Sequence, residues 1–119
     1  MAKTVKIQGS FEVINTAKTV EAKKVLNDEV SIDEATQLFP QKILASQTDV
    51  QLSMGGVAQA KRVFLRSSQE VTLKLNHSTD DGFPFGPGDG IFCSYTGITA
   101  IYVTTGANDT ELEAIITGS

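Results

Sequence analysis

The strongest constraint on the fold is an alternation of apolar and polar residues within Lys61–Asn76, KRVFLRSSQEVTLKLN. Successive side chains of a β-strand point to opposite faces, so alternation with period two predicts strands that bury one face. Two such segments flank residues 67–70, which fit a four-residue hairpin loop. We therefore expect a β-hairpin here. The inward side of its second strand should contribute to an inter-sheet core through Val71, Leu73 and Leu75.

Strand-like segments also occupy most of the remaining chain, separated by turn signals rich in Gly, Asn and Asp, of which Asn27-Asp28 is one. They comprise residues 5–13, 19–26, 41–46, 49–54, 91–95, 98–104 and 110–117. Residues 19–26 also suit a helix, and Gly9 suggests a bulge or a break in the first segment. The spacing predicts an all-β fold, a β-sandwich or jelly-roll-like barrel of seven to nine short strands with at most one short helix. A single domain over residues 1–119 is expected.

The short helix is expected at Ile32–Phe39. Ser31 and Glu34 have the spacing of a capping box, in which the two side chains satisfy backbone N–H groups at a helix start. Pro40 disfavours helical geometry at the residue before it, so the helix should end there after one or two turns.

Charge and composition exclude several classes of partner. The net charge is −4 and the Lys and Arg residues are dispersed, which argues against binding to nucleic acid or to an anionic membrane. No N-terminal leader is expected in residues 1–19, and no run approaches the roughly 20 apolar residues of a membrane-spanning helix. Cys93 is the only cysteine. Its strand-like surroundings predict a buried structural thiol, with a reactive or intermolecular thiol as the alternative.

Residues that carry chemistry are sparse. His77 is the only histidine, whereas triads and zinc sites need further partners that the sequence does not supply. The acids that come closest to a calcium set are Asp80, Asp81 and Asp89, but their spacing matches no calcium loop, so solvated turn acids are expected. We therefore expect no enzyme, with no catalytic, cofactor-binding or metal residues and no cofactor.

Two features are candidates for partner binding. Phe83 and Phe85 lie among the glycines and prolines of residues 77–90, a long irregular stretch. They either pack under this loop or anchor a partner, as interface aromatics do. Val5 and Ile7 alternate with polar residues in a segment that either pairs within its own sandwich or adds a strand to the sheet edge of a neighbour.

Four stretches in order carry a family resemblance: Val50–Val57, in which a strand ends at Gly55-Gly56, the alternating Lys61–Asn76, the strand Ile98–Val103, and the ending Leu112–Ser119. They resemble small virion proteins of tailed bacteriophages over about the C-terminal 70 residues. Several such proteins are β-sandwiches that decorate or cement capsids, commonly as trimers, and others serve at necks or tails.

The resemblance implies a non-enzymatic capsid decoration or cement protein that is made in the host cytoplasm and binds the outer surface of the phage head. Its expected partners are the major capsid protein and further copies of itself, with a homotrimer as the oligomer. The alternative is a neck, tail or receptor- and carbohydrate-binding β-sandwich, for which Phe83, Phe85, Tyr95 and Tyr102 are the candidate aromatics and tryptophan is absent. A cupin-type enzyme is the third reading, and a single histidine argues against it.

Overall fold

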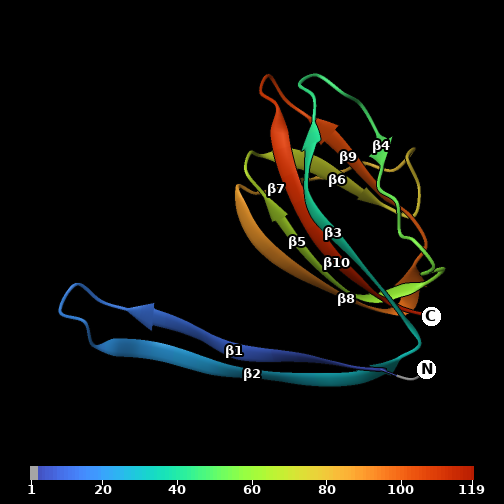
Figure 1. Cartoon of the computed structure of the whole chain (residues 1–119). Helices are drawn as coiled ribbons and strands as arrows, with labels where there is room; N and C mark the ends of the chain where they lie inside the picture. The colour runs from blue at the N-terminus through green and yellow to red at the C-terminus, as the bar shows by residue number, and fades with distance from the viewer. Residues whose placement is uncertain (1–2) are drawn as a thin grey trace. The chain divides into compact units, whose positions relative to one another are not determined.

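A computed structural model of the chain describes residues 3–119, apart from the side chain of Tyr95. The chain divides into two compact units, Met1–Ile32 and Asp33–Ser119, and each is described here by itself (Figure 1). The expected single domain over residues 1–119 stays a prediction.

The first unit is a two-stranded antiparallel sheet of β1 (Lys3–Ile14) and β2 (Val20–Ile32). A turn at residues 15–19 joins them, and the Asn15 Oδ1 accepts the backbone N–H groups of Ala17 and Thr19 at 3.0 Å each. The irregularity expected at Gly9 is wrong: Gly9 lies in regular register and the register shift falls between residues 13 and 14. We call this hairpin, Lys3–Ile32, the arm.

The second strand of the arm is longer than predicted. The strand reading of residues 19–26 is confirmed, but β2 continues through Asn27-Asp28, where the sequence predicted a turn. Those two residues pair with Gln8 and Ile7 of β1. The unbroken ladder along β1 satisfies the backbone groups at this position, so the local turn preference is overridden.

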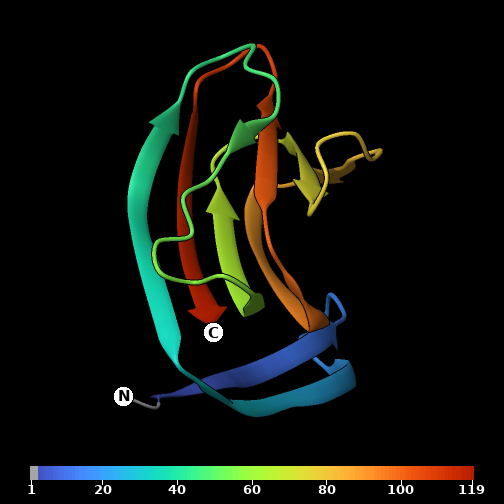
Figure 2. The same cartoon turned by 90° about the vertical axis from the view of Figure 1, so that its right-hand side faces the viewer.

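The second unit consists of eight strands in two four-stranded sheets (Figure 2). One sheet has the order β3-β10-β5-β8 and the other β4-β9-β6-β7. The strands are β3 (Glu34–Ile43), β4 (Val50–Gln51), β5 (Ala60–Ser67), β6 (Val71–Leu75), β7 (Phe83–Phe85), β8 (Gly88–Ile98), β9 (Ile101–Thr105) and β10 (Thr110–Gly118).

The chain passes from one sheet to the other at every connection except β6–β7. Eight strands that alternate in this way, with the first strand beside the last in one sheet, have the topology of a jelly roll. The predicted all-β sandwich or jelly-roll-like fold is therefore confirmed. Across residues 3–119 the structure has ten strands rather than seven to nine, and no helix.

The predicted hairpin within Lys61–Asn76 is wrong in its pairing, although both of its strands are confirmed. β5 belongs to one sheet and β6 to the other, so residues 67–70 form a crossover between sheets. Both strands point their apolar residues into the same core from opposite sides. Alternation is identical in a hairpin and in two facing strands, which is why the sequence did not distinguish them.

The predicted helix at Ile32–Phe39 is also wrong, because β3 occupies this segment. β3 pairs along its length with β10, and Leu38 packs against the core. Pro40 is accommodated because β3 is an edge strand and the ladder is irregular there, since Leu38 pairs with Ala114 and Gln41 with Leu112. Pairing with β10 therefore outweighs the local capping signal.

The core lies between the two sheets. The predicted inward side of β6 is confirmed, since Val71 and Leu73 are buried and Leu75 packs partly against the same cluster. The remaining members come from both sheets and from the connection after β4: Ile43, Leu52, Met54, Val57, Ala60, Val63, Leu65, Phe85, Ile98, Ile101, Val103, Leu112, Ala114 and Ile116. All of them belong to Asp33–Ser119, so this unit buries a core of its own.

Candidate functional site

One face of the arm is largely apolar. Directly paired residues of antiparallel strands point to the same side of the sheet. One side therefore carries Lys3, Val5, Ile7, Gly9, Phe11 and Val13 of β1 together with Ala22, Lys24, Leu26, Asp28, Val30 and Ile32 of β2. We call this side the arm face. The other side carries the polar residues of β1, including Lys6 and Glu12, and Lys23 Nζ lies 3.4 Å from the Glu12 carboxylate there.

Apolar side chains on the arm face are exposed toward the turn and half-buried or buried toward the other end, where Ile32 is 5% exposed. Val5 and Ile7, the predicted partner-binding residues of the N-terminal segment, are half-buried. Phe11 is 69% exposed and Leu26 is 42% exposed. A two-stranded hairpin by itself is marginally stable in water, and contiguous exposed apolar side chains mark interaction sites. The arm face is therefore the candidate functional site. Partner binding through Val5 and Ile7 stays a prediction.

The sequence identified only part of this face. Phe11 and Val13 were placed in the first strand by their alternation, but they were not singled out as binding residues. Part of the β2 half was missed because Asn27-Asp28 resembles a turn, so the predicted strand ended at residue 26. A strand continued through Val30 would have added Asp28 and Val30 to the side that carries Ala22 and Leu26, so the signal was present but was contradicted locally.

Phe83 and Phe85 lie in a strand rather than in an irregular loop. β7 and the start of β8 replace the end of the expected irregular stretch 77–90. Phe85 is buried in the core, and Phe83 is 37% exposed. The ring centroid of Phe92 lies 5.7 Å from that of Phe85 and 6.0 Å from that of Phe83. The self-packing reading is therefore the one that the structure shows for Phe85, and Gly90 leaves room for its ring.

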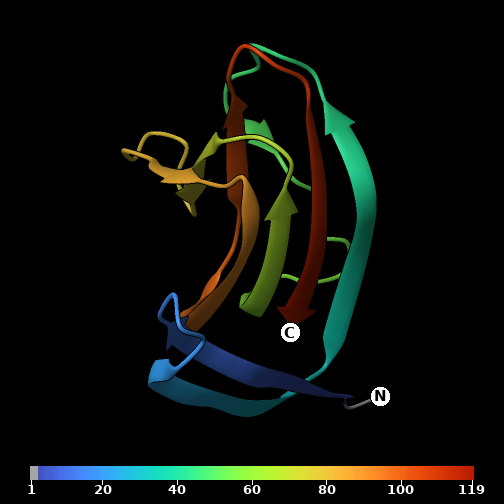
Figure 3. The same ribbon diagram turned by 90° about the vertical axis from the view of Figure 1, so that its left-hand side faces the viewer.

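The outer face of the β3-β10-β5-β8 sheet carries a short apolar row. Ile115 of β10 pairs with Phe64 of β5, which pairs with Ile91 of β8. The four strands lie side by side in Figure 3. Cys93 lies two residues beyond Ile91 and is exposed, so the prediction of a buried thiol is wrong. The inward position in this part of β8 belongs to Phe92, and alternation therefore turns Cys93 outward.

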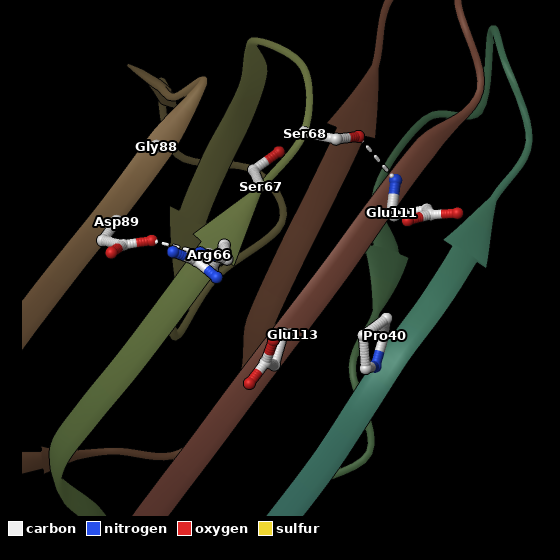
Figure 4. A pocket seen from close by; sticks show the side chains of 8 residues that line it. All are labelled: Pro40, Arg66, Ser67, Ser68, Gly88, Asp89, Glu111 and Glu113. Atoms are coloured by element: carbon white, nitrogen blue, oxygen red, sulfur yellow. Dashed lines mark hydrogen bonds and ion pairs between the residues drawn. The ribbon is translucent and has the colours of Figure 1, made fainter.

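A shallow hollow of about 480 Å³ lies on the same outer face (Figure 4). Arg66 Nε donates to Asp89 Oδ1 at 2.7 Å, and this hydrogen bond and charge raise the pKa of Arg66. The Glu111 N–H donates to Ser68 Oγ at 2.9 Å. Glu113 completes the acidic part of the lining. These groups are mostly exposed, so the hollow is a solvated sheet surface.

The candidate calcium acids are not brought together. Asp89 lies in β8 and pairs with Arg66, whereas Asp80 and Asp81 are exposed in the connection before β7. Within residues 3–119, no group of three or more His, Cys, Asp or Glu side chains is arranged to hold a metal ion. His77 is exposed and its backbone N–H donates to Leu75 O at the end of β6.

Among the aromatics considered for carbohydrate binding, Phe85 is buried, Tyr102 is half-buried and Phe83 is partly exposed beside Phe92. The side chain of Tyr95 lies outside the described residues. Over the part of the chain that the structure describes, no helix is long and apolar enough to span a membrane. Comparisons with protein-family models, with curated proteins and with solved structures find no match.

Proposed function

We propose that the protein is a non-enzymatic virion structural protein, a capsid decoration or cement protein that binds the outer phage head and stabilises it. The observation that carries the proposal is the arm face, an amphipathic two-stranded surface on a chain whose jelly roll already has its own core. Its partners are the major capsid protein and further copies of the same chain.

The difference between the two units, one with its own core and one without, supports an assembly role. Every member of the core cluster belongs to Asp33–Ser119, so the jelly roll does not need the arm to complete its core. The arm has no such cluster, and apolar side chains such as Phe11 remain exposed on it. A segment with these properties gains most of its stability from a binding partner.

The arm also offers backbone groups for strand addition. β1 and β2 pair only with each other among the described strands, so the outer edge of each strand has N–H and C=O groups that no other strand satisfies. Such edges accept an additional strand from a neighbour. Val5 and Ile7 would then supply side-chain contacts beside the backbone hydrogen bonds. Many weak contacts of this kind on one particle sum by multivalency, as cementing by a trimer requires.

The jelly-roll fold by itself does not identify the function. Jelly rolls occur in viral capsid proteins, in lectins and in cupins, and a fold shared by several activities does not identify one of them. The sequence resemblance to phage virion proteins is what favours the capsid role, and the arm is the structural feature that fits it.

Binding to capsid shells tests the proposal. Purified protein is mixed with tail-less heads of the virus that encodes it, after the heads have been stripped of this chain, and the heads are sedimented. We expect saturable binding at a fixed number of copies per capsomer and ordered density on the outer shell by electron microscopy. In electron microscopy of complete particles, density confined to the neck or tail would support the alternative role. Absence of the chain from the particle would refute both.

A further inference from the structure

Two charges on the arm face, Lys24 and Asp28, are placed symmetrically about the Gly9–Leu26 pair, and Lys3 lies at the end of the face. On β2, Lys24 and Asp28 lie two residues before and two residues after Leu26, so all three point to the same side. On β1, Gly9 pairs with Leu26, and Phe11 and Ile7 flank Gly9 in the same way. Rotating the face by half a turn about the Gly9–Leu26 pair therefore exchanges a basic position with an acidic one.

We propose that two copies of the chain associate by packing their arm faces together in antiparallel orientation. The two-fold axis passes between the Gly9–Leu26 pairs of the two copies and runs perpendicular to the strands. Lys24 of one copy then lies opposite Asp28 of the second copy, and Phe11 lies opposite Ile7 of the second copy. Each contact occurs twice because a two-fold interface uses the same patch on both subunits.

The charges select this orientation over the parallel one. In the parallel arrangement, β1 of one copy lies over β2 of the second copy. Each cross-strand pair then meets the same pair of the second copy, so Lys24 faces Phe11 and Asp28 faces Ile7. That arrangement buries charges against apolar side chains, which is unfavourable. In the antiparallel arrangement, opposite charges meet. The two carboxylate oxygens of Asp28 accept several donors, so a contact with Lys24 adds to its interactions within the chain.

Lys24 and Asp28 cannot form this pair within one arm. They are four residues apart on the same strand, which separates them by about 14 Å. On the opposite side of the hairpin, Lys23 Nζ lies 3.4 Å from the carboxylate of Glu12, its direct cross-strand partner. An ion pair between Lys24 and Asp28 therefore requires two copies of the chain.

The centre of the face has the shape that the symmetry requires. Leu26 of each copy lies near the axis, so the two leucines would meet head-on if the neighbouring positions were also filled. Gly9 has no side chain, and a Cβ placed there would have no heavy atom within 4 Å. This open space beside Leu26 lets both leucines lean aside as the faces close to the spacing of packed sheets, about 10 Å.

This inference deepens the proposed function, on which its biological role rests, because paired arms would link neighbouring copies on a shell. The association itself is a property of the purified chain and is measured without any capsid. Loss of shell binding with arm pairing intact would refute the proposed function alone. Shell binding by a chain that does not pair through its arms would refute this inference alone.

Charge exchange across the interface is the decisive experiment. Sedimentation velocity of the purified full-length protein should show concentration-dependent self-association. Lys24→Asp or Asp28→Lys should each weaken it about tenfold or more, because each change creates two like-charge contacts. The double variant Lys24→Asp/Asp28→Lys restores opposite charges and should return the dissociation constant to within about threefold of the wild type.

A matched pair of neutral substitutions separates the arm face from the rest of the arm. Leu26→Asn should weaken self-association, whereas Val25→Asn should not, since Val25 is 63% exposed on the opposite side. Far-ultraviolet circular dichroism confirms that each variant is folded. A wild-type monomer at about 100 µM, or an oligomer that resists both single charge reversals, overturns the inference. So does a double variant that fails to recover.

Discussion

Truncating Leu73 to Ala should destabilise the jelly roll strongly, and the same truncation at Leu44 should not. Leu73 is fully buried at the centre of β6, where it pairs with Val103 on one side and Phe83 on the other. Leu44 follows β3 in the same unit, and its side chain is largely exposed. The two variants remove the same atoms from the same unit, so they differ only in what those atoms contact.

The magnitude follows from burial. A buried Leu→Ala change loses the transfer free energy of the removed carbons and leaves a cavity, which together cost about 2–5 kcal/mol. Strand pairing on both sides of β6 limits how far the backbone can collapse into the space, so we expect about 3 kcal/mol for Leu73. Domains are stable by about 5–15 kcal/mol in total. A surface change such as Leu44→Ala stays within about 0.5 kcal/mol.

Urea unfolding followed by circular dichroism measures both variants. With a denaturant slope of about 2 kcal/mol/M, the midpoint of Leu73→Ala should fall by about 1.5 M at unchanged slope, and that of Leu44→Ala should stay within about 0.3 M of the wild type. Equal midpoints for the two variants would show that the β6 side chains do not form the inter-sheet core and would refute the assignment of β6 to the second sheet.

Three further predictions concern other parts of the jelly roll. Gly118→Val should lower the urea midpoint, because an added Cβ would collide with the backbone carbonyl of Gln59; an unchanged midpoint would contradict this close approach. The backbone N–H of Ala45 and the ammonium of Lys42 lower the pKa of Asp109 below its ordinary value of 3.8, so this carboxylate stabilises the folded state above that pH and the contribution disappears as pH falls through the lowered pKa. Asp109→Asn should therefore flatten the loss of stability in acid, and a pH profile identical to the wild type would count against the contact. The thiol of Cys93 should react with a disulfide reagent in the native protein at a rate close to its rate in urea, since it is exposed; protection that disappears only on unfolding would restore the buried reading.

Much of the fold could be predicted because each strand separately shows the alternation of apolar and polar residues. Val71 and Leu73 were placed correctly on the buried side, since a half-buried strand repeats every two residues whichever strand lies beside it. The candidate site was predicted only in part. Val5 and Ile7 do lie on the arm face, but Phe85 belongs to the core. The contribution of Asp28 and Val30 was missed because of a turn signal that pairing with β1 overrides.

The sequence by itself therefore determined that the chain is all-β, where most of its strands lie, and which side of each strand is apolar. Only the tertiary structure decided which strands pair. It separated β5 from β6 into opposite sheets, turned a capping-box segment into β3 beside β10, and left the arm paired only with itself among the described strands. The physical reason is that side-chain alternation is a local property. The strand that pairs with a given strand lies far along the chain. Which pairing forms depends on the difference in free energy between competing pairings, and that difference cannot be calculated from one segment alone.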